Sequence, residues 1–344
     1  TGDLVGPVPR YGRGIRRSGA RRRSVAPTDV LHSRTTPAPR AERTGQPRTE
    51  PRHEHPALSS GVELHAVHWE ADVGFDPELP PWLLVHGLAS NARLWDGVAL
   101  NLSRLGHDVV AVDQRGHGLS SKPDDGYDMG TVADDLRLLI DDVGWERPAV
   151  AGQSWGGNVV LELAVRHPAN VHTIACVDGG FIDLATRFPD WDEAAVALAP
   201  PRLAGTPLDQ ITRWLETSAS DWPEEGRRGT LANFEVRDDG TIAPWLTFDR
   251  HLKVLRGLWE HQPSTRYPNV GVPTLLIGAD TGDVAWSHSK HEAVDHALTA
   301  LPTGRAEWFN PAHHDVHAQH PDAVASLLHR AVTETDFFAP ETAS

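Results

Sequence analysis

The chain of 344 residues has a single cysteine, a single methionine and no long apolar run. One cysteine cannot form an intramolecular disulfide, so a fold stapled by disulfides is excluded. Cys176 lies in the apolar run at residues 174–177, which predicts a buried structural thiol. No run approaches the roughly 20 apolar residues that span a bilayer. We therefore expect no membrane span and a cytoplasmic protein.

Positive charge is concentrated at the N-terminus of an otherwise acidic chain. Residues 1–56 contain twelve arginines and five acidic residues, which gives +7, so the remainder carries −22 of the net −15. The first part is rich in Pro, Arg, Gly, Ser and Thr and has no apolar periodicity, which predicts a disordered extension over residues 1–56. No apolar segment follows its arginines, so we expect no secretory signal. The acidic remainder argues against nucleic acid as a partner.

From residue 62 onward, short apolar runs alternate with helical patterns. The runs that predict strands are residues 62–69, 82–85, 109–112, 148–151, 173–177, 274–277 and 305–309. Helical spacing predicts helices over residues 132–143, 154–166, 288–298 and 317–332. This alternation is typical of the α/β class, with a mostly parallel central sheet flanked by helices.

The alternation breaks between residues 181 and 268 into Trp- and Pro-rich helical pieces. An insertion of this size at a sheet edge is most simply a lid over the strand ends, where open α/β sheets bind ligands. We therefore predict a core of residues 57–180 and 269–336, and a helical cap of residues 181–268.

Residues 152–156 read Gly-Gln-Ser-Trp-Gly, between a predicted strand and a predicted helix. A Gly-x-Ser-x-Gly pattern in this context puts the serine on a strained turn, with Gly152 and Gly156 where side chains would collide with backbone. The hydroxyl then lies at a helix N-terminus, near its positive dipole. Ser154 is therefore the predicted nucleophile of a serine hydrolase.

A serine hydroxyl is a weak nucleophile and needs a base, normally a histidine. Of the 20 histidines, His314 follows the last predicted strand and is the predicted base, with His313 as the alternative. His313, His317 and His320 also have the i, i+4, i+7 spacing of one helix face, which can bind a metal. A helical metal pair normally has further carboxylate or histidine ligands elsewhere, and a metal here would compete with the base position of His314, so we expect no metal.

These motifs together resemble the α/β-hydrolase fold superfamily over residues 61–336, in which nucleophile, acid and histidine follow in that order. His86 and Gly87 look like the oxyanion loop of that family. The loop at residues 113–118 resembles the one after its next strand, and His314 stands seven residues before a proline, as is common there.

The resemblance also implies what stabilises the reaction. An oxyanion needs two preorganised donors, and backbone amides supply them without reorganisation. By resemblance, these are the N–H groups of Leu88 and Trp155. The family chemistry implies no cofactor.

The acid of the triad is left open. The strand at residues 274–277 is followed by Asp280 and Asp283, where the family usually shows one acid. Asp283 is preferred because it lies farther from the strand end, with Asp280 then a turn residue. Asp178 is the third candidate, because some members of the family take their acid from the strand before the cap.

The sequence thus predicts an esterase- or lipase-like hydrolase that cleaves an ester, thioester or lactone of a small to medium apolar substrate through an acyl-enzyme. Carbon–carbon bond hydrolysis and a perhydrolase or haloperoxidase-like reaction are alternatives, because they use the same apparatus. Ser154 disfavours epoxide hydrolases, which would place an aspartate there. A non-catalytic ligand-binding protein of the same fold is the alternative of another class. No oligomeric state is predicted.

Overall fold

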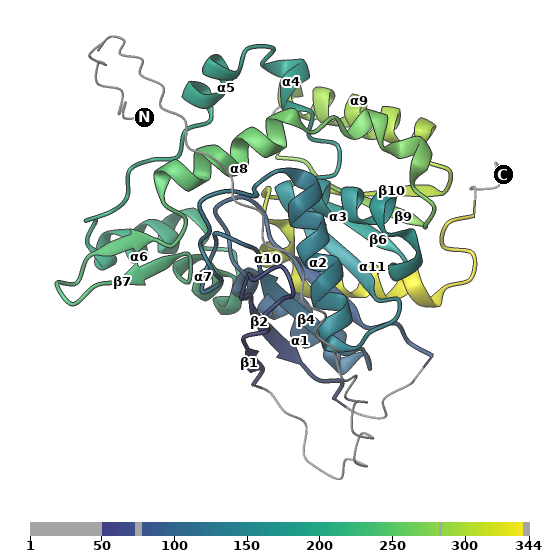
Figure 1. Cartoon of the computed structure of the whole chain (residues 1–344), viewed down its shortest axis with the longest axis horizontal. Coiled ribbons are helices and arrows are strands. Elements are labelled where there is room, and N and C mark those ends of the chain that lie inside the picture. The colour runs from purple at the N-terminus through teal and green to yellow at the C-terminus, as the bar shows by residue number, and fades with distance from the viewer. Residues whose placement is uncertain (1–49, 73–77, 282–283, 340–344) are drawn as a thin grey trace, which may run out of the picture. The chain divides into compact units, whose positions relative to one another are not determined.

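A sheet with the strand order β1-β2-β4-β3-β5-β6-β9-β10 forms the centre of the computed structural model, which describes residues 50–72, 78–281 and 284–339 (Figure 1). In chain order its strands are β1 (Arg52–Glu54), β2 (His65–Trp69), β3 (Trp82–Val85), β4 (Val109–Asp113), β5 (Ala149–Gln153), β6 (Ile174–Val177), β9 (Thr274–Ala279) and β10 (Gly304–Phe309). The strands from β4 across to β10 pair in parallel, and β1 and β2 extend the sheet antiparallel. Every residue of β2 to β6 and β9 is buried, which explains why the parallel strands β3 to β6 and β9 read as largely apolar runs.

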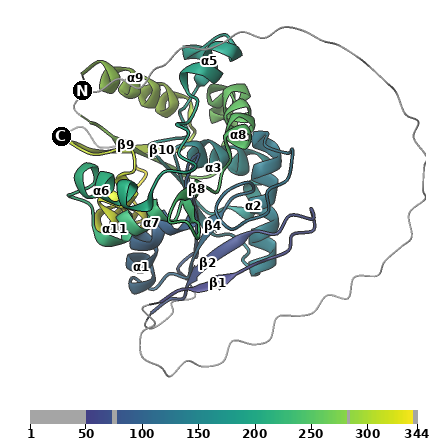
Figure 2. The ribbon, with the colours of Figure 1, turned by 90° about the vertical axis from the view of Figure 1, so that its left-hand side faces the viewer.

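Helices cover both faces of the sheet. They are α1 (Asp96–Arg104), α2 (Met129–Val143), α3 (Trp155–Arg166), α9 (Val284–Ala300), α10 (Val316–Gln319) and α11 (Pro321–Thr333). Helices α2 and α3 pack together on one face, and α1 and α11 pack together on the other (Figure 2). Side chains alternate between these two layers along each strand: Leu83 packs with the first pair of helices and Leu84 with the second.

Residues 178–273 join β6 to β9 and contain helices and one separate hairpin. The elements are α4 (Leu184–Arg187), α5 (Trp191–Ala197), α6 (Leu208–Ser218), α7 (Glu224–Leu231), β7 (Phe234–Val236), β8 (Ile242–Pro244), α8 (Phe248–Glu260), and the short 3₁₀ helices η3 (Pro263–Thr265) and η4 (Tyr267–Asn269). Helix α8 packs tightly on the loop before α2, since a Cβ added to Gly257 would lie 2.1 Å from the carbonyl oxygen of Tyr127. The same loop receives a hydrogen bond of 2.9 Å from Arg250 to the carbonyl of Lys122.

The predicted class and each predicted strand are confirmed, and three details differ. The helix predicted over residues 317–332 is divided into α10 and α11, because Pro321 lacks the N–H that a continuous helix requires. Helix α1 and strand β1 were not predicted. Because β1 begins at Arg52, the predicted disordered extension of residues 1–56 is wrong for its last part, and residues 1–49 lie outside the described residues.

Two further expectations can be compared with the described residues. Cys176 is a free thiol with no exposed surface, as predicted, and burial raises its pKa to about 12. Within residues 50–72, 78–281 and 284–339, no helix is both long and apolar enough to cross a membrane.

Candidate active site

Ser154 lies on the turn between β5 and α3, in a backbone conformation that residues with side chains rarely adopt. Its φ and ψ angles are 53° and −121°. The flanking glycines permit this turn. A Cβ on Gly152 would lie 2.1 Å from the carbonyl oxygen of Gly156, and a Cβ on Gly156 would lie 2.4 Å from that of His86. Both motif glycines are therefore required by close backbone packing, and they bring Ser154 to the start of α3.

His314 makes its acid contact with Asp178, at the end of β6. The His314 Nδ1 lies 2.5 Å from Oδ2 of Asp178, whose side chain is 1% exposed, whereas the His314 side chain is 51% exposed. Asp178 also accepts a 3.0 Å hydrogen bond from the N–H of Ala279. Because the carboxylate accepts, the Nδ1 carries the proton, and this tautomer leaves the lone pair on Nε2 to act as a base.

The electrostatics of this pair follow from its charges. Burial by itself would lower the pKa of His314, but the hydrogen bond to Asp178 and the charges of Asp315 and Asp178 raise it above its usual value of 6.5. Burial would raise the pKa of Asp178, but the bond and charge of His314, together with Lys290, hold it below its usual value. The pair is therefore a stable ionised carboxylate beside a strengthened base.

The backbone brings this pair to the serine turn. The N–H of Ser154 donates to the carbonyl of Val177 at 2.9 Å. A Cβ on Gly179 would lie only 2.1 Å from the carbonyl oxygen of Ser154. From the other side, the Gln153 amide donates to the carbonyl of His314 at 3.3 Å. The segments that carry Ser154, Asp178 and His314 therefore meet at the carboxyl ends of β5 and β6.

The other predicted acid and base candidates have different surroundings. Asp280 is hydrogen-bonded to the Ser287 hydroxyl, and its carbonyl accepts the N–H of Ala312 at 2.8 Å, so it holds the loop that precedes His314. The preferred acid, Asp283, lies outside the described residues. The ring of His313, the alternative base, packs edge-on against Trp222 at 5.8 Å. The observed contact of His314 is thus with Asp178, the third of the predicted acids.

The predicted oxyanion loop also approaches the serine. A Cβ on Gly87 would lie 3.1 Å from Cβ of Ser154. The His86 ring fixes the loop: its Nδ1 donates to the carbonyl of Gly87 at 2.7 Å, and its Nε2 accepts the N–H of Gln114 at 3.0 Å. Burial lowers the pKa of His86, which keeps the ring neutral and able to make both bonds. The two predicted oxyanion donors are the backbone N–H groups of Leu88, the residue after Gly87, and of Trp155, the first residue of α3.

Strained backbone occurs in the oxyanion loop, at the candidate nucleophile and at the candidate acid. Among the described residues, three that are not glycine have positive φ angles: Ala89 at 60°, Ser154 at 53° and Asp178 at 44°. Ala89 belongs to the oxyanion loop, and the other two are the candidate nucleophile and acid. Strained residues cluster at functional sites, where the surrounding structure holds them in place.

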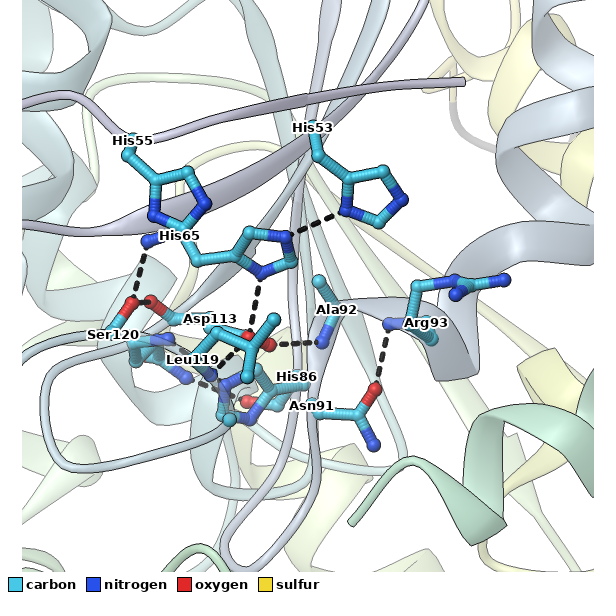
Figure 3. Close-up of polar contacts among 12 residues, drawn as sticks. His53, His55, His65, His86, Asn91, Ala92, Arg93, Asp113, Leu119 and Ser120 are labelled. Carbon is cyan, nitrogen blue, oxygen red and sulfur yellow. Dashed lines mark hydrogen bonds and ion pairs between the residues drawn. The ribbon is translucent and has the colours of Figure 1, made fainter. Parts of the chain in front are cut away.

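A buried carboxylate supports the oxyanion loop. Asp113 accepts hydrogen bonds from Nδ1 of His65 at 2.8 Å, the N–H of Ala92 at 2.7 Å and the N–H of Leu119 at 2.8 Å (Figure 3). The His65 Nε2 lies 2.8 Å from Nδ1 of His53, which links β1 to this carboxylate. Burial opposes the charge, but these bonds and nearby histidines lower the pKa of Asp113 to about 2. Asp113 is therefore a charged anchor for two loops.

The C-terminal histidines with metal-like spacing do not converge on one point. His313 packs on Trp222, as described above. His317 is fully buried, with its ring 4.3 Å from that of Trp95, and burial lowers its pKa to about 3. His320 stacks on Phe309 at 5.9 Å. The helical spacing did not produce a shared face, because α10 begins only at Val316.

Segment 181–268 contacts the loops on both sides of the site. Asn91, which caps the 3₁₀ helix η1 (Ala92–Trp95), donates to the carbonyl of Gly229 on α7 at 2.8 Å. Gln319 on α10 donates to the carboxylate of Asp221 at 2.6 Å. Helix α7 and the residues before it are thereby tied to the oxyanion side and to the histidine side.

One charged group at the site was not predicted. Lys290 on α9 lies with its Nζ 2.8 Å from both carboxylate oxygens of Asp178, and its side chain is 9% exposed. The sequence shows only a lysine on a helix that also carries the exposed residues His288 and Glu292. No local pattern distinguishes a lysine that turns inward from one that faces solvent.

Comparison with known proteins shows which family the chain is similar to. The model of the α/β hydrolase fold family matches residues 80–321. The chain is 36% identical over 121 residues to epoxide hydrolase A of Mycobacterium tuberculosis, which covers 35% of this chain and 36% of that protein. It is 34% identical over 99 residues to 2-(acetamidomethylene)succinate hydrolase of Mesorhizobium japonicum, which covers 29% and 35%. The chain therefore matches about a third of the length of these curated relatives.

A solved structure extends the likeness in fold to most of the chain. The crystal structure of E-2-(acetamidomethylene)succinate hydrolase has a TM-score of 0.65 at 21% sequence identity, and the match covers 82% of this chain and 99% of that one. The family match, the sheet order and the turn at Ser154 together show that this chain belongs to the α/β-hydrolase fold family.

Proposed function

We propose that this chain is a serine hydrolase that cleaves a carboxylic ester, thioester or lactone through an acyl-enzyme on Ser154. The observation that carries the proposal is the 2.5 Å contact between His314 and Asp178. A buried carboxylate on imidazole Nδ1 orients the base that a serine nucleophile requires. The strained backbone of Ser154, between two glycines that tolerate no side chain, supports the same assignment.

In the proposed reaction, the Oγ of Ser154 attacks the carbonyl carbon while its proton passes to Nε2 of His314. Asp178 stabilises the imidazolium, and the N–H groups of Leu88 and Trp155 donate to the oxyanion. The bond to the leaving group then breaks as His314 returns the proton to the departing oxygen or sulfur. Water attacks the acyl-enzyme with the help of the same base, which releases the acid and restores the serine.

We assign the choice of substrate to residues 181–268, acting as a cap over the site. The hydrogen bonds of this segment to both site loops, through Asn91 and Gln319, support this role. The acidic charge of the chain beyond residue 56 favours an uncharged or cationic apolar substrate over a polyanion.

The second candidate is hydrolysis of a carbon–carbon bond by the same residues. The relative from Mesorhizobium japonicum supports keeping an alternative to ester hydrolysis, because the compound in its name, 2-(acetamidomethylene)succinate, carries an amide and carboxylates and no ester. Epoxide hydrolysis is disfavoured, although an epoxide hydrolase is among the relatives. Opening an epoxide through an ester intermediate requires a carboxylate nucleophile, and this chain has Ser154 at that position.

A fluorophosphonate probe tests the nucleophile, and a panel of aryl esters of increasing chain length together with lactones tests the substrate class. We expect the wild type to be labelled and Ser154→Ala to be unlabelled, with turnover lower by on the order of 10⁴–10⁶. Absence of label, under conditions in which a control esterase is labelled, would contradict the proposal and favour a binding protein. Labelling without turnover of any ester or lactone would favour the second candidate.

A further inference from the structure

The ammonium of Lys290 is buried against the carboxylate that we assign as the triad acid. Its Nζ lies 2.8 Å from each oxygen of Asp178, and it also donates to the carbonyl of Ala279 at 2.5 Å. An ammonium has three protons, and these three acceptors use all of them. Lys290 therefore ties α9 to the adjacent ends of β6 and β9.

This contact restricts how the carboxylate can turn. One oxygen of Asp178 accepts the N–H of Ala279 and the other accepts Nδ1 of His314, while Lys290 bridges both. Rotation of the carboxylate about its last bond would break the bridge and the backbone contact together. The φ angle of 44° at Asp178 lies in the left-handed region, which residues other than glycine rarely adopt, so the surrounding contacts also hold its backbone in place.

Lys290 also brings a second positive charge to the same carboxylate. Its Nζ and the imidazole Nδ1 of His314 are 2.8 Å and 2.5 Å from the same oxygen, Oδ2, so they lie no more than 5.3 Å apart. A proton added to His314 therefore meets a like charge at short range. Asp178 raises the pKa of His314, and Lys290 lowers it.

We propose that Lys290 is a positioning residue of the catalytic pair, which clamps Asp178 in the orientation that receives His314 and prevents the imidazole from being too strong a base at neutral pH. The inference rests on the function proposed above. Lys290 does not touch the reacting atoms, so it acts through its contact with Asp178 and through its charge near His314.

The other charged groups around His314 leave the effect measurable. Asp178 and Lys290 face it from β6 and α9, Asp315 adjoins it in the chain, and His317 follows on α10. His317 has a pKa of about 3 and stays neutral at higher pH. Burial raises the pKa of Asp315, and its negative charge favours a protonated His314, opposite to the effect of Lys290.

The test compares Lys290→Gln, which removes the charge, with Lys290→Arg, which retains it. We expect Lys290→Gln to move the acid limb of the kcat/KM profile about 1 pH unit upward, because a nearby like charge typically shifts a pKa by this amount or more. Lys290→Arg should keep the midpoint of the wild type. Glu292→Gln on the same helix, which removes an exposed charge paired with His288, is the matched control and should leave the midpoint unchanged.

A second readout does not depend on turnover. The Hε1 resonance of His314, titrated by NMR in the Ser154→Ala background and assigned with a His314→Gln variant, should show the same upward shift when Lys290 is replaced. If the chain proves not to be a serine hydrolase, fluorophosphonate labelling fails while this titration still reports on Lys290. An unmoved or lowered midpoint in a labelled, active enzyme would overturn the inference alone.

Folding of the variants is itself decisive. If Lys290→Gln does not fold, Lys290→Met, whose unbranched apolar chain has a similar volume, takes its place in both titrations. If neither folds while Lys290→Arg does, the ammonium serves only to neutralise a buried carboxylate, and the positioning role is wrong.

Discussion

Replacing Asp178 by asparagine separates the three acid candidates most sharply. In the wild type, one carboxylate oxygen accepts the backbone N–H of Ala279 and the other accepts His314 Nδ1, while Lys290 donates to both. An asparagine has only one oxygen. The N–H of Ala279 cannot change, but an imidazole can move its proton, so the amide nitrogen faces His314. The ring then carries its proton on Nε2, where the base is needed.

The expected magnitude is large because the wrong tautomer removes the base without moving it. The same substitution in a serine protease triad lowers kcat by about 10⁴, which is about 5 kcal/mol of transition-state stabilisation. We expect a loss of this order for Asp178→Asn with an aryl ester at pH 8. The melting temperature, measured in parallel, shows whether the variant is folded.

Two matched variants complete this experiment. Asp280→Asn should keep activity within about tenfold, because the carboxylate of Asp280 contacts Ser287. Its contact with the loop before His314 is made by the backbone carbonyl, which the substitution retains. Asp283→Asn should behave in the same way. A folded Asp178→Asn variant with nearly normal kcat, together with a large loss of kcat in either of the other two variants, would refute the assignment of Asp178. The triad acid would then be Asp280 or Asp283, after β9.

Three further predictions concern pH, packing and stability. Because the pKa of His314 is raised and the base must be neutral, kcat/KM should rise with pH through a midpoint above 6.5, and a lower midpoint would contradict this. Gly156→Ala places a Cβ 2.4 Å from the carbonyl oxygen of His86, so urea unfolding should show a loss of about 1–3 kcal/mol, whereas Gly271→Ala, with its nearest atom at 3.9 Å, should be neutral. The pKa of Asp113 is lowered from 3.8 to about 2, so its charge stabilises the fold above pH 3.8, and this contribution is lost as the pH falls through about 2. Asp113→Asn should therefore cost about 2 kcal/mol at pH 7, and a difference that does not shrink toward pH 2 would count against this account.

The parts of the fold that were predicted correctly carry local signals. The buried parallel strands read as apolar runs, because both of their faces are covered by helices. The turn at Ser154 has its own pattern, because Gly152 and Gly156 are sterically required. The break before α11 also had a signal in Pro321, and the prediction of one continuous helix passed over it.

The proposed acid had no such signal. Asp178 and Asp280 follow β6 and β9, which are neighbours in the sheet, so both carboxylates lie at the same edge. Spacing along the chain cannot distinguish them, because the choice depends on where the loop that carries His314 crosses that edge. Lys290 was missed for a related reason: its partner lies 112 residues away. Contacts between distant segments were the part that the sequence alone did not reveal.

The position of Asp178 has a consequence for how this protein could be re-engineered. The proposed nucleophile and acid both belong to the unit formed by β5, α3 and β6, and they are joined through the backbone contacts of Val177 and Gly179 with Ser154. The proposed cap, residues 181–268, begins only after this unit ends. A foreign segment grafted between β6 and β9 would therefore leave the relative positions of the proposed nucleophile and acid unchanged. The graft would only have to preserve the position of the loop that carries His314.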